Sequence, residues 1–118
     1  MRTVQVQGGT MFERDIADKT VLWCIKRLGL GKLRTLHICV DIKRLHDCAG
    51  YCEDTHTPRL FMIAVATNQS LRDFVMTVIH EMVHVRQYVR NKWVGDGEEE
   101  AWSLQEQLVD EIWKEDVL

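Results

Sequence analysis

The chain has 118 residues, a length that suits one domain with a single modest core. Hydrophobic residues make up 46% and charged residues 28% of the chain, as in ordinary soluble globular proteins. The formal net charge of −3 gives no electrostatic reason to expect binding to nucleic acid or to an anionic membrane surface. We therefore expect one domain over residues 1–118 and no nucleic-acid partner.

No apolar stretch approaches the ~20 residues that a membrane-spanning helix needs. Residues 1–7 alternate in polarity as a strand does, and they lack the apolar segment of a signal peptide. These observations predict no membrane association and a cytoplasmic location, in which the four cysteines stay reduced. Nothing in the sequence indicates an oligomeric state.

The first half of the chain alternates between strand and helix patterns. A short strand at 4–7 ends at two glycines, and apolar residues at helical spacing follow over 11–28. Apolar and β-branched residues then predict a strand at 35–42 and another at 59–67, from Arg59 to Thr67. The polar segment between them, 46–55, is interpreted as a second strand or an irregular hairpin arm.

The second half of the chain is helical. Ser70 is placed as the N-cap of a long helix over 71–91, and Asp73 supplies the acidic residue of a capping box. A turn at 92–97 leads into a last helix over 98–114. The order of elements predicts an α+β fold, with an N-terminal helix, a three- to four-stranded mostly antiparallel sheet, and two further helices.

The long helix contains the sequence His80-Glu81-Met82-Val83-His84. On an α-helix, His80 and His84 lie about 40° and roughly 6 Å apart, so both imidazoles can reach one ion. Two nitrogens at this spacing suit Zn²⁺, which takes three protein ligands in catalytic sites. Glu81 is then placed to accept a proton from a water molecule in the site, as a general base.

The position of this motif on the helix supports a metal site. The apolar residues of the helix occupy one broad face, and His80 and His84 lie on the opposite side, with Glu81 at its margin. A pair of surface histidines on an ordinary amphipathic helix is the alternative. A face that is merely solvated more often carries Lys and Glu, which favours the metal site.

The third ligand must come from elsewhere, and the last helix begins with Glu98, Glu99 and Glu100. Around this helix, Glu98 points toward the mean direction of the apolar side chains, Glu99 lies on the flank, and Glu100 faces water. Glu99 also suits a capping box with Asp96. A carboxylate aimed at the core is costly unless it meets a cation, so Glu98 is the expected ligand.

The run from His80 to Tyr88 resembles the active-site helix of SprT-like and other small gluzincin metallopeptidases, the minigluzincins among them. Many stand-alone examples of this group are phage or bacterial proteins of about this size. The resemblance implies a small zincin-like fold, peptide-bond hydrolysis, and one Zn²⁺ held by His80, His84 and Glu98. The glutamate ligand of gluzincins is followed by a small residue three positions later, and Glu98 with Ala101 matches this pattern.

The chain departs from the gluzincin pattern at Trp102, where many members have an aspartate or asparagine that supports a histidine ligand. Asp73 or Gln105 could take that part. A tyrosine often stabilises the oxyanion in such enzymes, and Tyr88 and Tyr51 are equal alternatives here.

The leading hypothesis is a zinc metallopeptidase with Glu81 as general base and a protein or peptide as substrate. By resemblance, the substrate would add as a strand along 59–67, at an edge of the sheet. The alternative function is a zinc-stabilised interaction module that binds a partner protein and cleaves nothing.

Overall fold

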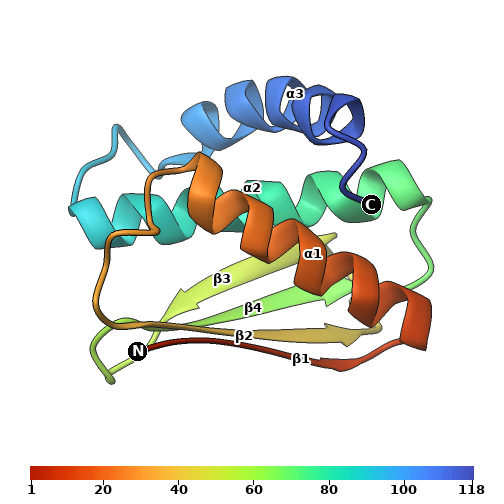
Figure 1. Ribbon diagram of the computed structural model, residues 1–118, viewed down its shortest axis with the longest axis horizontal. Helices are drawn as coiled ribbons and strands as arrows, with labels where there is room; N and C mark the ends of the chain where they lie inside the picture. The colour runs from red at the N-terminus through yellow and green to blue at the C-terminus, as the bar shows by residue number, and fades with distance from the viewer.

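The computed structural model describes all 118 residues as three helices and four strands (Figure 1). The predicted α+β class is confirmed, and the last helix starts and ends at the predicted residues. The elements in chain order are β1 (Arg2–Gly8), α1 (Met11–Arg27), β2 (Leu36–Lys43), β3 (Gly50–Asp54), β4 (Leu60–Ala66), α2 (Leu71–Arg90) and α3 (Glu98–Lys114).

The four strands form one mixed sheet in the order β1-β2-β4-β3. The strands β1, β2 and β4 run parallel, and only β3 pairs antiparallel with its neighbour. The expectation of a mostly antiparallel sheet was therefore wrong. The physical reason is that α1 connects β1 to β2 as a crossover, and a crossover returns the chain in the same direction.

The position of β4 also differs from the sequence prediction. We expected residues 59–67 to form a sheet edge open to a substrate, but β4 pairs with β2 on one side and with β3 on the other. Its residues are largely buried, as in an interior strand. The edge strand on this side is β3. After β2 the chain first forms β3 at the edge and then returns to form β4 between β2 and β3.

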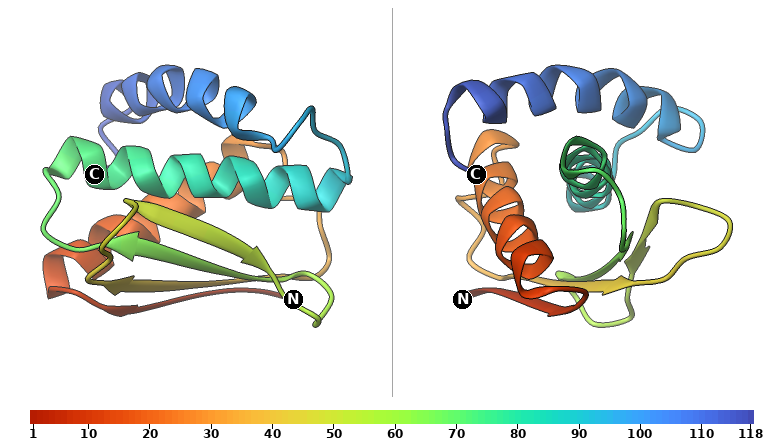
Figure 2. Two further views of the ribbon diagram at one scale, coloured as in Figure 1. Left: turned by 180° about the vertical axis from the view of Figure 1, so that it is seen from behind. Right: turned by 90° about the vertical axis from the view of Figure 1, so that its right-hand side faces the viewer.

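The helices cover one face of the sheet in two layers (Figures 1 and 2). Both α1 and α2 lie against the sheet, and α3 packs over α2 on the side away from the strands. As a result α2 is buried on two sides, with its apolar residues toward the sheet and its histidine face toward α3. This arrangement encloses the histidine face, which on a two-layer fold would be solvated.

The chain end lies away from the histidine face. Val117 and Leu118 pack against the hydrophobic core, and Leu118 lines a small hollow with Phe12, Ile16 and Leu71. No helix of this structure combines the length and the apolarity that crossing a membrane requires.

Glu13 joins the start of α1 to the loop before α2. Its carboxylate accepts hydrogen bonds from the backbone N–H of Thr10 at 2.9 Å, from the Thr67 hydroxyl at 2.8 Å, and from the backbone N–H of Asn68 at 3.2 Å. The first bond completes a capping box with Thr10. Partial burial alone would raise the pKa of Glu13, but these hydrogen bonds outweigh burial and lower it.

We predict that Glu13→Gln lowers the free energy of unfolding by about 1 kcal/mol at pH 7, because the amide cannot accept charge-assisted bonds. The folded-state pKa is depressed, so the contribution is present above the ordinary pKa of a glutamate and disappears as the pH falls through the folded value. Urea unfolding of parent and variant at pH 7 and at pH 3 measures the difference. Glu106→Gln, at an exposed carboxylate on α3, is the control; an equal effect at both pH values would contradict the assignment.

Candidate metal centre

The two histidines of α2 lie one turn apart on the face that α3 covers. The helix begins at the predicted cap, where the Ser70 hydroxyl accepts the backbone N–H of Asp73 at 3.2 Å. The imidazole rings of His80 and His84 are 5.0 Å apart between centroids, and their side chains are only 11% and 12% exposed. Both rings therefore face one enclosed position between α2 and α3.

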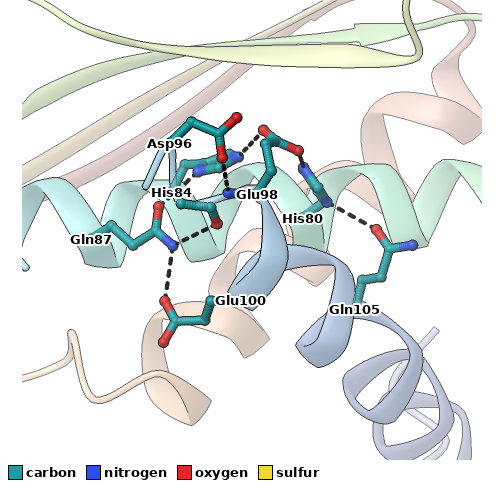
Figure 3. Close-up of polar contacts among 8 residues, drawn as sticks. His80, His84, Gln87, Asp96, Glu98, Glu100 and Gln105 are labelled. Carbon is teal, nitrogen blue, oxygen red and sulfur yellow. Dashed lines mark hydrogen bonds and ion pairs between the residues drawn. The ribbon is translucent and has the colours of Figure 1, made fainter. Parts of the chain in front are cut away.

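Glu98, the first residue of α3, places its carboxylate between the two rings (Figure 3). One carboxylate oxygen lies 3.0 Å from Nε2 of His80, and the other lies 2.8 Å from Nε2 of His84. The potential ligand atoms of the three residues all lie within 4.8 Å of one another. The structure thus brings together the three residues that the sequence singled out.

The hydrogen bonds of Gln87 determine which nitrogen of His84 carries a proton. Gln87 Nε2 donates to the backbone carbonyl of Gly97 at 3.0 Å and to the Glu100 carboxylate at 2.8 Å. Both partners only accept, so the amide orientation is fixed and Gln87 Oε1 faces His84 Nδ1 at 2.8 Å. Nδ1 of His84 must therefore be the donor.

A neutral His84 with its proton on Nδ1 presents a lone pair at Nε2, toward Glu98. A lone pair and a carboxylate oxygen attract each other only when a cation lies between them, either a proton on Nε2 or a metal ion. His80 has the same arrangement, with Gln105 Oε1 at 2.9 Å from Nδ1 and Glu98 at Nε2. Histidine ligands of metals are typically held in this way, by a hydrogen bond to the nitrogen that does not bind the ion.

Gly97 makes the approach of Gln87 possible. Its φ angle is +81°, a left-handed conformation that side chains rarely adopt, and a Cβ atom there would lie 2.3 Å from Gln87 Oε1. Gly97, and not Asp96, occupies the N-cap position of α3. Asp96 instead accepts the backbone N–H of Glu98 at 3.0 Å, which fixes the first residue of the helix.

Glu81 is buried, with 4% exposure, and lies beside the histidine pair. Loss of hydration and the charge of Glu98 raise its pKa, the charge of His84 lowers it, and the balance is a pKa of about 7. A Cβ atom at Gly50 on β3 would lie 3.3 Å from the Glu81 carboxylate and 2.7 Å from a methyl group of Thr77. A glycine at the start of β3 thus allows the backbone of this strand to approach Thr77 and the Glu81 carboxylate closely.

A cleft of about 660 Å³ begins at His80, Glu81 and Glu98. It runs between the start of β3 and the N-terminal half of α2, and the first turns of α3 close its far side. The other lining residues are Cys48, Ala49, Gly50, Tyr51, Gln69, Asp73, Met76, Thr77, Trp102 and Gln105. A molecule entering this cleft reaches the general-base candidate Glu81 and two of the proposed metal ligands, His80 and Glu98.

The surroundings of the site differ from the sequence predictions at the start of α3. Glu99 is exposed and makes no capping box with Asp96. Glu100 is half exposed, but it does not merely face water, because it accepts a bond from Gln87. Trp102, the residue that departs from the gluzincin pattern, is 60% exposed and packs edge-on against His80, with 5.1 Å between centroids.

Of the two residues considered as supports for a histidine, Gln105 contacts His80 and Asp73 contacts neither histidine. The sequence analysis missed Gln87 as the support for His84. Its position three residues after His84, on the same helix face, was the available signal. Sequence spacing alone could not reveal that Gly97 and Glu100 hold the Gln87 amide in one orientation.

The two tyrosines considered for the oxyanion role lie at different places. Tyr88 stacks on Phe61 with 6.0 Å between ring centroids and meets Trp93 edge-on at 5.7 Å. Tyr51 borders the cleft, and the Lys43 ammonium lies 5.8 Å from its ring. Neither hydroxyl bonds to His80, His84 or Glu98.

Comparison of the chain with protein-family models, with curated proteins and with solved structures finds no match.

We predict that Glu98→Ala weakens binding of a divalent metal ion by at least about 100-fold, because two histidines alone do not form a three-ligand site. Glu99→Ala, the matched control one residue away, should leave the affinity nearly unchanged. Competitive metal titration of the purified variants measures both. Retention of the metal by Glu98→Ala together with its loss in Glu99→Ala would show that the wrong carboxylate has been assigned.

Gln87→Met keeps the length of the side chain but removes the acceptor for His84 Nδ1. We expect a 10–100-fold loss of metal affinity, the usual effect of losing a residue that orients a histidine ligand. Gln107→Met, at an exposed position of α3, serves as the control in the same titration. Unchanged affinity in the Gln87 variant would mean that α2 alone orients the ring.

Proposed function

We propose that this protein is a zinc-dependent metallopeptidase of the small gluzincin type. The observation that carries the proposal is the convergence of His80, His84 and Glu98 beside a buried Glu81 at the end of one cleft. Two imidazole nitrogens and one carboxylate are the ligand types that catalytic zinc sites use with a fourth position left for water.

His80 Nε2, His84 Nε2 and the Glu98 carboxylate would hold the ion. Zinc bound there supplies a Lewis acid that lowers the pKa of water and polarises a carbonyl group. Gln87 and Gln105 hold the two rings by their Nδ1 atoms, so the Nε2 lone pairs stay directed at Glu98. The buried carbonyl of Gly97 fixes Gln87 in turn.

Glu81 performs the proton transfer in this proposal. Its carboxylate accepts one proton of the attacking water while a C–O bond forms at the peptide carbonyl. The proton then passes to the amine nitrogen as the C–N bond breaks. Glu81 is free for this task, because no hydrogen bond from a neighbouring residue contributes to its environment.

The substrate is proposed to bind beside β3. This strand has a single partner, β4, and its first residues border the cleft next to Glu81. An extended peptide can add to such an edge through backbone hydrogen bonds. In this proposal β3, and not residues 59–67, is the strand that pairs with the substrate.

The alternative, a zinc-stabilised interaction module, leaves Glu81 unexplained. Burying a carboxylate without a partner is costly, and a purely structural metal site gains nothing from it. The position of Glu81 in the lining of the cleft also favours a reaction at this place.

The test is Glu81→Gln. We expect this variant to bind one zinc ion per chain as the parent does, since Glu81 is not a ligand, and to lose peptide hydrolysis by about 10²–10⁴-fold. Metal analysis and digestion of casein or of a peptide library measure the two properties. Glu106→Gln is the control that removes one carboxylate elsewhere. Hydrolysis by the Glu81 variant at the parent rate would overturn the proposal, as would a zinc-loaded parent that hydrolyses no peptide.

A further inference from the structure

The lining of the cleft has an unbalanced charge. It contains the carboxylates of Asp73, Glu81 and Glu98 and no lysine or arginine. In the proposed enzyme, a divalent ion balances Glu81 and Glu98. Asp73 is then the one negatively charged residue of the lining that has no positive charge beside it in the cleft.

Asp73 is exposed and its carboxylate forms no ion pair. Its neighbour in the sequence, Arg72, points elsewhere and pairs with Asp110 on α3 at 2.8 Å. Two hydrogen bonds fix the backbone of Asp73. Its N–H donates to the Ser70 hydroxyl, and its carbonyl accepts from the Thr77 hydroxyl. The backbone position of Asp73 at the cleft is therefore fixed, and its carboxylate has no ionic partner.

An independent observation indicates that this cleft receives a ligand. Glu81 lies in the same lining, is 96% buried, and has no hydrogen-bonding partner in the protein. Its carboxylate oxygens are not fully buried, so they are accessible from the cleft and available to a ligand there. The cleft is therefore a binding site, and Asp73 is a free charge within it.

The apolar part of the lining suits a long cationic side chain. Met76 lies on α2 one turn after Asp73, and Trp102 faces the cleft from α3 with 60% exposure. Methylene groups of arginine or lysine pack on such surfaces while the charged end meets a carboxylate. The exposed indole of Trp102 can also attract a guanidinium over its face.

From these contacts we propose that the cleft binds peptides carrying an arginine or lysine, and that Asp73 determines this specificity. The inference rests on the proposed function, since it names the substrate class of the same site. Asp73 and His80 are seven residues apart on one helix, or about 10.5 Å along its axis. Because an extended peptide advances about 3.3–3.6 Å per residue, the basic side chain lies within about three residues of the bond that is cleaved.

The experiment compares two blocked peptides that differ only in arginine or citrulline, which has nearly the same shape and no charge. Calorimetric titration of the zinc-loaded parent at low ionic strength should give about tenfold or tighter binding of the arginine peptide. Asp73→Asn should bind both peptides with the affinity of the citrulline peptide. Glu106→Gln should keep the preference, because its exposed carboxylate lies outside the cleft.

Equal binding of the two peptides by the parent, no binding of either, or an undiminished preference in Asp73→Asn would each overturn this inference. These results are separable from failure of the proposed function. Peptide hydrolysis that shows no dependence on arginine leaves the metallopeptidase proposal intact. An Asp73-dependent preference in a protein that hydrolyses nothing supports the binding site and rejects the enzyme.

Discussion

The site depends on the contact of one carboxylate with two imidazoles across the interface of α2 and α3. Glu98 lies within 3.0 Å of Nε2 on both histidines, and it occupies the first position of its helix. The helix dipole favours a carboxylate at the N-terminus of a helix. It does not favour a carboxylate that faces the lone pairs of two imidazole nitrogens, because like charges repel. A proton on Nε2 or a metal ion would resolve this conflict, and a metal ion would be attracted by all three groups at once.

The interface around this contact keeps the histidines from rotating. The Gln87 amide links α2 to the backbone before α3, and the Gln105 amide links α3 back to His80. The bonds from Gln87 to Gly97 and from Gln105 to His80 cross between α2 and the segment that follows it, and the bond between His84 and Gln87 lies within α2. The two imidazoles are only 11% and 12% exposed, and this partial enclosure strengthens their polar contacts. The geometry of the three proposed ligands is thus set before any ion binds, as a catalytic site requires.

The sheet explains why the site opens on one side only. On the side toward the sheet, α2 is packed against β3 and β4, so no ligand can enter there. At the edge, the antiparallel β3 brings Gly50 next to Glu81 and leaves a cleft that continues past Asp73. The edge strand β3 therefore borders the cleft that leads to Glu81. In the proposed function it also offers its free backbone edge to a peptide.

The sequence by itself determined the elements and most of the site. The spacing of His80 and His84 on one helix, and the direction of Glu98 relative to the apolar side chains of α3, follow from helical periodicity, which acts locally. Sequence patterns also placed α2, α3 and the strands β1, β2 and β4 near their observed positions, whereas residues 46–55 were left as either a strand or an irregular hairpin arm.

Strand order, the interior position of β4, the exposure of Trp102 and the role of Gln87 were decided only by the tertiary structure. Each of these depends on which elements become neighbours, and residues far apart in the chain carry no local signal of that. Gln87 acts through the carbonyl of Gly97 and the carboxylate of Glu100, which meet it only when α3 folds back over α2.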